Sequence, residues 1–331
     1  MNILTIISLF CDKDYQYIPA LLKRIDKKVI CNYELILVDN REKNKNIEIP
    51  EIWEFFKTHN GELISKGENL CQLAAKKWAV SKAIGDYVWF VDGDDDLEDT
   101  VSYRILNTCK EDIIVFNYTM DNIDTDVKVY QECFITDKII KNKKIFRTDD
   151  YLRLACPTCW NKWFRKDLLQ KVFENIPNNI RVSCNEDVYI FSAMLNRSKK
   201  VHQIPVYIYT NRPDRGTSNN NIHSVERFKL ILQGWQESMK LFKKEFPKDT
   251  ELFIYESKKN SDTRYFLSRI CCSDKEIWKD EIDLLIKVIE PSYIKNIVKQ
   301  CSIECFLSDN MRDIEVASDL KIEILKILNN I

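Results

Sequence analysis

The stretch from Tyr87 to Asp96 constrains the fold of this chain more than any other part of the sequence. Five apolar residues lead into four carboxylates that a single glycine interrupts, Asp92-Gly93-Asp94-Asp95-Asp96. An aromatic and β-branched run of this length predicts a buried strand. The acids follow the carboxyl end of that strand, where open α/β sheets bind their ligands. The alternative is a solvated acidic turn.

Repulsion between these carboxylates is the physical reason to expect a bound cation here and not merely an acidic turn. Carboxylates this close together raise each other's pKa unless a positive charge lies among them. Oxygen ligands of this kind favour Mg²⁺ or Mn²⁺, with a phosphate group completing the coordination. The acidic stretch therefore predicts a site for a divalent ion and a phosphate-bearing ligand.

Strand-like and helical segments alternate before the acidic stretch. The strand-like segments are Ile3–Phe10, Tyr33–Asp39 and Gly61–Ser65. Helical spacing of apolar residues covers Tyr15–Lys28, the stretch around Ile52–Lys57, and Leu70–Ala83, with Gly85 expected to close the last helix. This alternation predicts βαβ units, and so an α/β fold with a mainly parallel, Rossmann-like central sheet.

The order is looser beyond Leu97. We expect strands at Asp112–Tyr118 and Lys200–Thr210, helices at Trp160–Val172 and Val188–Leu195, and a hairpin or loop at Asp121–Lys144. From Ser224 onward only helical periodicity remains, with a break at Pro291. We therefore expect a first domain over residues 1–222. A C-terminal helical region over residues 223–331 would contact the acceptor, a second copy or a membrane.

Charge and cysteine content narrow the function classes. The net charge is −1, so no overall basic field attracts nucleic acid or an anionic membrane. The twelve cysteines occur without an N-terminal export signal, which favours reduced thiols in a cytoplasm. The opening apolar run, Ile3–Phe10, is too short to span a bilayer.

Several segments, taken in order, resemble motifs of family-2 glycosyltransferases with the GT-A fold. The segments are Val38-Asp39, the helix start Asn69 to Lys76, the strand and acids from Ala83 to Asp95, Trp160 to Lys166, Asn185-Glu186-Asp187, and Tyr207 to Arg212 followed by Ser218. They span about two thirds of the chain. The resemblance implies an inverting, metal-dependent enzyme that uses a nucleotide-sugar donor.

The resemblance also implies roles for individual residues. Donor binding is expected from Asp39, Asn69, Lys76, Asp92, Asp95, Arg212, Arg215 and Ser218. Asp94 and Asp92 are the expected ligands of Mn²⁺ or Mg²⁺, and His223 is a further candidate whose alternative is a surface histidine. Asp187 is the expected general base, with Glu186 as its neighbour or orienting group. Trp160 and Lys162 are expected on the acceptor side, although Trp160 could instead be core, and Asp96 is expected to be a solvated acid.

Some positions depart from the family's pattern. Leu9, Phe10 and Cys11 replace its usual proline and asparagine after the first strand, and Cys71 and Trp78 replace glycines. Asn40-Arg41-Glu42 stands where the family commonly has D-G-S. These departures alter the nucleoside pocket, so the identity of the nucleotide stays open.

The expected function is transfer of a sugar from a nucleotide-diphosphate donor, a UDP-sugar, to a hydroxyl of a glycan or lipid-linked glycan in bacterial surface polysaccharide or lipooligosaccharide synthesis. Two alternatives stay open: a Mg-dependent phosphotransferase of the haloacid-dehalogenase kind, and a catalytically inactive glycan- or nucleotide-binding protein. A phosphotransferase of the haloacid-dehalogenase kind has Thr or Val two positions after its second acid, whereas this chain has Asp96 there. The sequence does not determine the donor sugar or the linkage. Nor does it determine whether the chain forms a homodimer or contacts the inner face of the membrane.

Overall fold

The computed structural model describes residues 3–12, 14–41, 49–98, 101–122, 127–131, 137–141, 158–182, 186–212, 225–245, 263–300 and 314–330. The chain divides into two compact units, Met1–Asn219 and Asn220–Ile331. The first contains the sheet and the second is helical in its described parts.

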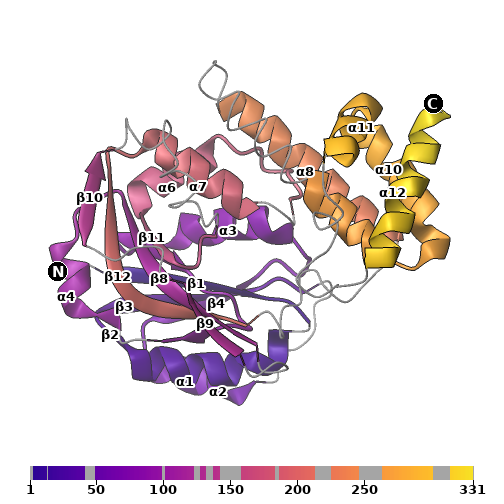
Figure 1. Ribbon diagram of the computed structural model, residues 1–331. Coiled ribbons are helices and arrows are strands. Elements are labelled where there is room, and N and C mark those ends of the chain that lie inside the picture. Colours follow the sequence, from indigo (N-terminus) through magenta and orange to yellow (C-terminus); the bar gives the residue numbers. More distant parts are fainter. Residues whose placement is uncertain are drawn as a thin grey trace. The chain divides into compact units, whose positions relative to one another are not determined.

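A ten-stranded sheet organises the first unit (Figure 1). Its main path runs in the order β10-β12-β8-β11-β5-β1-β3-β4, while β6 pairs with β12 and β9 pairs with β8. The strands are β1 (Leu4–Phe10), β3 (Tyr33–Asp39), β4 (Gly61–Ser65), β5 (Tyr87–Phe90), β6 (Asp96–Leu97), β8 (Ile113–Asn122), β9 (Val127–Gln131), β10 (Lys138–Lys141), β11 (Lys162–Arg165) and β12 (Lys200–Asn211). A separate pair joins β2 (Val29–Ile30) to β7 (Val101–Ser102).

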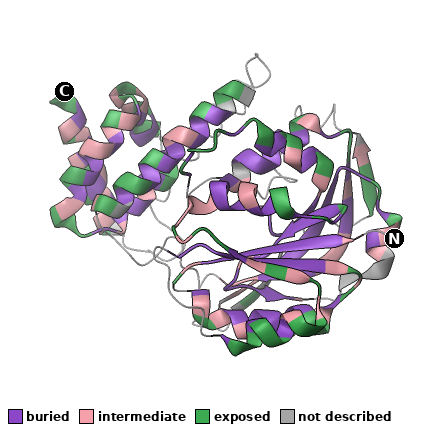
Figure 2. Ribbon diagram, turned by 180° about the vertical axis from the view of Figure 1, so that it is seen from behind, coloured by how far each residue is buried: buried purple, intermediate pink, exposed green. Residues whose placement is uncertain are grey.

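Four neighbouring strands, β4, β3, β1 and β5, are parallel, as the sequence predicts. Every residue of β1 and β5 is buried, because helices cover both faces of the sheet and shield these strands from water (Figure 2). The register pairs Phe10 with Asp39 and Asp39 with Ser65, so these strands end at the same edge. The amide of Val91 donates to the carbonyl of Ile7 at 2.9 Å, which brings the acidic stretch to that edge.

Helices pack on both faces of the sheet (Figure 1). One face carries α1 (Ile18–Lys28) and α2 (Pro50–Thr58), and a 3-10 turn, η1 (Asp14–Tyr17), precedes α1. The other face carries α3 (Cys71–Lys82), α6 (Lys166–Glu174) and α7 (Glu186–Arg197), while α4 (Tyr103–Thr108) follows β7. The buried residues of α1 are Ile18, Leu21, Leu22 and Ile25, which is the face that the periodicity predicts.

The prediction of one helix over Trp160–Val172 is wrong in its first part. Residues Lys162–Arg165 form β11, which lies antiparallel between β5 and β8, and only from Lys166 does the chain become helical. Trp163 and Phe164 are fully buried there, on opposite faces of the strand. Two aromatic neighbours that both require burial are accommodated by a central strand more readily than by an amphipathic helix.

Gly85 also has a different role from the expected one. Helix α3 ends at Lys82 with Ala83 as its cap, and Gly85 lies against β1 instead. A β-carbon at position 85 would lie 2.6 Å from the hydroxyl oxygen of Thr5 and 2.7 Å from the carbonyl oxygen of Ile3. The glycine therefore allows the chain to approach β1 closely before β5 begins.

The second unit is built from helices in its described parts. They are α8 (Val225–Glu245), residues 263–271, α10 (Trp278–Val288), α11 (Pro291–Gln300) and α12 (Ile314–Asn329), with a 3-10 turn, η3 (Lys275–Ile277), before α10. Pro291 begins α11, in agreement with the expected break. Phe266 packs edge-on against both Phe228 and Trp235 in its core. Within the described residues no helix combines the length and apolar character that a membrane span requires.

Candidate active site

The acidic stretch forms a tight turn between β5 and β6. The amide of Asp95 donates to the carbonyl of Asp92 at 3.3 Å, and the chain enters β6 at Asp96. Asp92 is half-buried, whereas Asp94 and Asp95 are buried. A short turn therefore holds several carboxylates out of bulk water, which is costly unless positive charge or hydrogen-bond donors compensate them.

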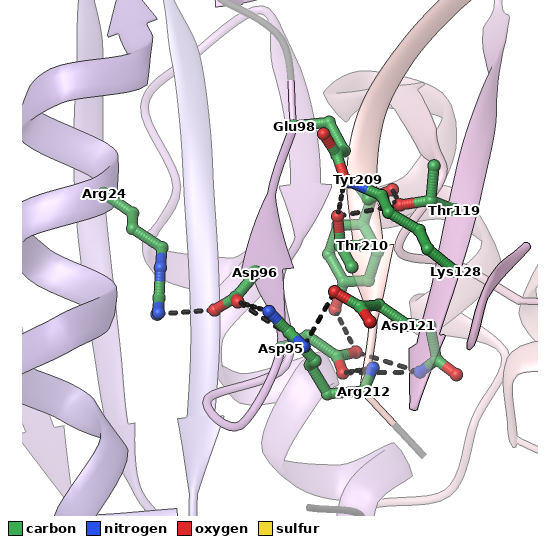
Figure 3. Close-up of polar contacts among 11 residues, drawn as sticks. Arg24, Asp95, Asp96, Glu98, Thr119, Asp121, Lys128, Tyr209, Thr210 and Arg212 are labelled. Atoms are coloured by element: carbon green, nitrogen blue, oxygen red, sulfur yellow. Dashed lines mark hydrogen bonds and ion pairs between the residues drawn. The ribbon is translucent and has the colours of Figure 1, made fainter. Parts of the chain in front are cut away.

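Hydrogen-bond donors from β12 surround Asp95. Its carboxylate accepts from the Tyr209 hydroxyl at 2.7 Å, from the Asn211 amide group at 3.1 Å and from the backbone N–H of Arg212 at 2.6 Å (Figure 3). Burial nevertheless raises the pKa of Asp95 to about 6, with these three donors opposing the rise and Asp96 adding to it. Asp95 therefore changes charge in a range that an activity assay can reach.

Tyr209 links this network to the aromatic core, a role that the sequence did not reveal. Its hydroxyl also accepts from the backbone N–H of Asp92 at 3.1 Å. Its ring stacks on Trp160, with centroids 4.6 Å apart and planes inclined by 13°. The ring of Trp160 also packs edge-on against Tyr118, so this tryptophan serves the core, the alternative considered from the sequence. The only sequence signal for Tyr209 was its place in the segment from Tyr207 to Arg212.

A second cluster joins α3 to the start of α7. The Lys76 ammonium contacts Glu186 Oε1 at 3.0 Å and Asp187 Oδ1 at 2.6 Å, and its side chain is only 4% exposed. The other oxygen of Asp187 accepts from the backbone N–H of Cys159 at 3.0 Å. Lys76, expected from the sequence to bind the donor, thus lies on the two acids expected to carry out catalysis.

The two acids of this cluster differ in pKa. Burial raises the pKa of Glu186 above its ordinary value, and Lys76 offsets only part of that rise. Burial acts in the same direction on Asp187, but Lys76 and the donors from Cys159 outweigh it and lower its pKa. Asp187 is therefore the carboxylate that stays ionised, while Glu186 is the one more easily protonated.

The acidic turn and the second cluster interact electrostatically. Burial raises the pKa of Asp92 well above its ordinary value; Lys76 opposes this rise, whereas Asp95, Asp187 and Asp94 add to it. The charges of both Lys76 and Asp187 therefore affect the pKa of Asp92, although α7 lies far from the turn in sequence. The expected base and one of the expected metal-binding acids thus interact electrostatically.

The nucleoside side of the expected site begins at Asp39. This acid is 5% exposed and forms a two-pronged ion pair with Arg41, through Nε at 2.8 Å and Nη2 at 2.9 Å. The guanidinium of Arg41 also lies over the ring of Tyr15, 4.8 Å from its centroid. Asn69 accepts from the Cys71 amide at 2.8 Å, and Asn40 accepts from the Leu70 amide at 2.8 Å. Arg41 stands at a position that departs from the family's pattern. It forms an ion pair with Asp39, the acid expected to bind the nucleoside of the donor.

Lys162 and Arg212 are both held by partners within the protein. Lys162, expected on the acceptor side, is fully buried and donates to the Thr158 carbonyl and the Asn161 side chain, each at 2.6 Å. Arg212, expected on the donor diphosphate, pairs through its guanidinium with Asp96 at 2.8 Å and with Asp121 at 2.8 Å. Arg215, Ser218 and His223 lie outside the described residues.

The prediction that Asp96 is a solvated acid is wrong. Its side chain is 9% exposed, and a second arginine, Arg24 of α1, contacts its other oxygen at 2.6 Å (Figure 3). Asp95, in the turn, contacts Tyr209 and Asn211, whereas Asp96, at the start of β6, contacts Arg24 and Arg212. The two neighbouring acids therefore lie in different environments.

The chemistry of the acidic turn fits a divalent cation. Asp92 and Asp94 offer carboxylate oxygens, and a cation beside Asp92 would oppose the rise in its pKa that burial and the neighbouring acids cause. Among the described residues no three His, Cys, Asp or Glu side chains are grouped as a complete metal site. The two acids would therefore need oxygens from a ligand or water to complete a coordination shell.

Solved structures with the same fold include those of S. aureus TarS. The chain aligns over its full length with 91% of a TarS 1-349 structure in complex with UDP-GlcNAc, with a TM-score of 0.59 and 13% identity. It aligns with 90% of a TarS 1-349 structure in complex with UDP, with a TM-score of 0.56 and 14% identity. This likeness confirms the expected fold: a mixed α/β domain of the GT-A type.

A curated relative and a family model match the sequence itself. The cholesterol galactosyltransferase of Borreliella burgdorferi is 24% identical over 236 residues, which are 67% of this chain. The chain spans 64% of the length of that relative. The model described as glycosyl transferase family 2 matches residues 5–173, about half of the chain, and this match sets aside the phosphotransferase alternative. From its fold, the order of its motifs and this match, the chain belongs to glycosyl transferase family 2.

Proposed function

We propose that this chain transfers a sugar from a UDP-sugar to a hydroxyl group of a glycan or lipid-linked glycan, with inversion at the anomeric carbon, in the synthesis of a bacterial surface polysaccharide. The observation that carries the proposal is the buried Lys76 ammonium, which pairs with Glu186 and Asp187 and also interacts electrostatically with Asp92 of the acidic turn. It supports a site in which one end holds a diphosphate and the other end accepts a proton.

In the proposed reaction the hydroxyl oxygen of the acceptor attacks the anomeric carbon. The bond from that carbon to the diphosphate breaks, and the hydroxyl proton passes to the carboxylate of Asp187. The backbone N–H of Cys159 orients this carboxylate, and Lys76 keeps it ionised. Attack from the side opposite the leaving group accounts for inversion.

Lys76 has two parts in this proposal. In the structure its ammonium lowers the pKa of Asp187, which limits the basicity of that acid. A donor diphosphate near Asp92 would draw on the same ammonium, because Asp92 already interacts with it. Binding of the donor would then raise the pKa of Asp187 and make it a better base when the acceptor is present.

The proposed metal ligands are Asp92 and Asp94. A bound Mg²⁺ or Mn²⁺ would neutralise charge that develops on the departing diphosphate. Asp95, held by Tyr209, Asn211 and Arg212, would keep the turn in shape for the donor.

Two substitutions test donor binding and chemistry separately. Asp94→Ala should abolish Mn²⁺-dependent binding of UDP and UDP-GlcNAc, measured by isothermal titration calorimetry. Asp187→Asn should retain that binding but lower the rate of UDP release from UDP-sugars by at least about 10²-fold, as expected for a positioned base. Asp167→Asn, an exposed acid in the first turn of α6, is the matched control and should change neither quantity.

The outcomes separate the proposal from its alternatives. Undiminished binding by Asp94→Ala would remove Asp94 as a metal ligand. Near-normal turnover by Asp187→Asn would place the base elsewhere. Metal-dependent binding of UDP without turnover of any UDP-sugar in the wild-type chain would favour a catalytically inactive binding protein.

A further inference from the structure

A basic pocket of about 350 Å³ lies between α1 and the strands on the far side of the acidic turn. Its cationic lining residues are Lys23, Arg24, Lys27 and Lys28 of α1, Lys128 of β9, and Arg212 after β12. Three carboxylates, Asp96, Glu98 and Asp121, also line it. With six positive and three negative groups the pocket carries a net charge of about +3 at neutral pH.

The pocket adjoins the candidate active site, but no residue of the expected metal site or of the Lys76 cluster lines it. Arg212 belongs to both places, because its backbone N–H donates to Asp95 and its guanidinium lines the pocket and contacts Asp96. Asp95 contacts Tyr209, whereas Asp96 contacts Arg24 (Figure 3). Binding at the pocket can be measured without sugar transfer.

The carboxylates of the pocket are already paired, and two of its lysines are not. Asp96 holds both Arg24 and Arg212, Asp121 holds Arg212, and Glu98 pairs with Lys128. Lys23 and Lys27 are exposed, and neither forms an ion pair with a described residue. They stand four residues apart on α1, where like charges repel each other.

We propose that this pocket binds the phosphate group of an anionic ligand. The guanidinium groups of Arg24 and Arg212 contact different oxygens of Asp96 from opposite sides (Figure 3), and guanidinium donors match phosphate oxygens. Lys23 and Lys27 at its rim supply the positive charge that no carboxylate among the described residues neutralises. The volume admits a phosphorylated small molecule or the head group of a phospholipid, and both present the same chemistry.

Inorganic pyrophosphate is the first probe, titrated into the full-length protein in the presence of EDTA. Removing divalent ions keeps the diphosphate from binding through a metal at Asp92 and Asp94. Wild-type protein should bind pyrophosphate, and the affinity should fall at high ionic strength because the exposed lysines are screened. The double variant K23Q/K27Q should bind about 10-fold more weakly.

Two further variants provide controls. K82Q/K171Q removes two exposed lysines from α3 and α6, on the other face of the sheet, and should bind pyrophosphate like the wild type. Asp121→Asn removes one negative charge at the side of Arg212 and should bind about 3-fold more tightly. Substitutions that merely perturb the fold would weaken binding in both pocket variants.

Vesicles distinguish the two sources of phosphate. Co-sedimentation with phosphatidylglycerol vesicles but not with phosphatidylcholine vesicles, lost in K23Q/K27Q, would identify a lipid head group. Pyrophosphate binding without vesicle binding would identify a free phosphorylated molecule. The proposal is overturned if neither probe binds the wild type, or if K82Q/K171Q weakens binding as much as K23Q/K27Q does.

Discussion

Replacing Lys76 with methionine would leave two buried carboxylates without their cation. Glu186 and Asp187 are 11% and 22% exposed, and the ammonium lies 3.0 Å and 2.6 Å from their oxygens. Methionine preserves most of the side-chain volume of lysine. The substitution therefore tests charge rather than packing.

The loss of stability in Lys76→Met depends on pH, and the direction of this dependence follows from the pKa of Asp187. In the wild type this pKa is lowered, so Asp187 stabilises the fold above its unfolded pKa, and that contribution is lost as the pH falls through the folded value. Without Lys76, burial dominates and raises the pKa of Asp187, so the variant loses stability as the pH rises. Removing one partner of a buried ion pair costs about 3–5 kcal/mol. The partial exposure of Asp187 argues for about 3 kcal/mol at pH 8.

Thermal unfolding at pH 8 and at pH 4 measures this effect. A loss of about 3 kcal/mol corresponds to a fall in Tm of about 6–12 °C for a unit of this size. The fall should shrink at pH 4, where protonation neutralises the unpaired acids. Lys77→Met is the matched control, because among the described residues the ammonium of this neighbour on α3 donates to the Ile176 carbonyl and the Asn178 side chain and contacts no carboxylate.

A pH-independent loss of stability in Lys76→Met would refute the reasoning. So would a loss at pH 8 no larger than that of Lys77→Met. Either result would mean that the contacts of Lys76 contribute through packing, and that Asp187 does not depend on this ammonium for its ionised state.

Two further predictions concern single buried acids. The affinity for Mn²⁺ and UDP should decline as the pH falls through about 6, because protonated Asp95 loses its negative charge and accepts more weakly from Tyr209, Asn211 and Arg212. A titration showing constant affinity between pH 5 and pH 8 would contradict this. Glu281 of α10 is 1% exposed and burial raises its pKa to about 7, so the second unit should lose stability as the pH rises from about 4.5 to 7. Glu281→Gln should then raise the Tm at pH 8, a gain of about 1–3 kcal/mol, and have little effect at pH 4. Equal effects at both pH values would exclude a titrating carboxyl.

Local patterns in the sequence were sufficient to predict the strands of the parallel half of the sheet. The apolar runs that end in Asp39 and Asp92 predicted strands whose carboxyl ends meet, and the register of β1, β3 and β5 agrees. Strands buried on both faces have continuous apolar sequences. In the helices between them, apolar residues recur at the helical period, which is visible in the sequence alone. The expectation of family-2 membership was confirmed on the same stretch of chain.

The environment of each acid was decided only by the tertiary structure. Asp95 and Asp96 are neighbours in sequence, yet one faces Tyr209 and the other faces Arg24 and Arg212. Lys76 meets Asp187 through the packing of α3 beside α7, and no local pattern encodes that contact. Strand β11 formed where a helix was expected because its aromatic residues are buried between β5 and β8. Charge, burial and pKa depend on groups distant along the chain, so the sequence determined which acids are present and the fold decided what each of them can do.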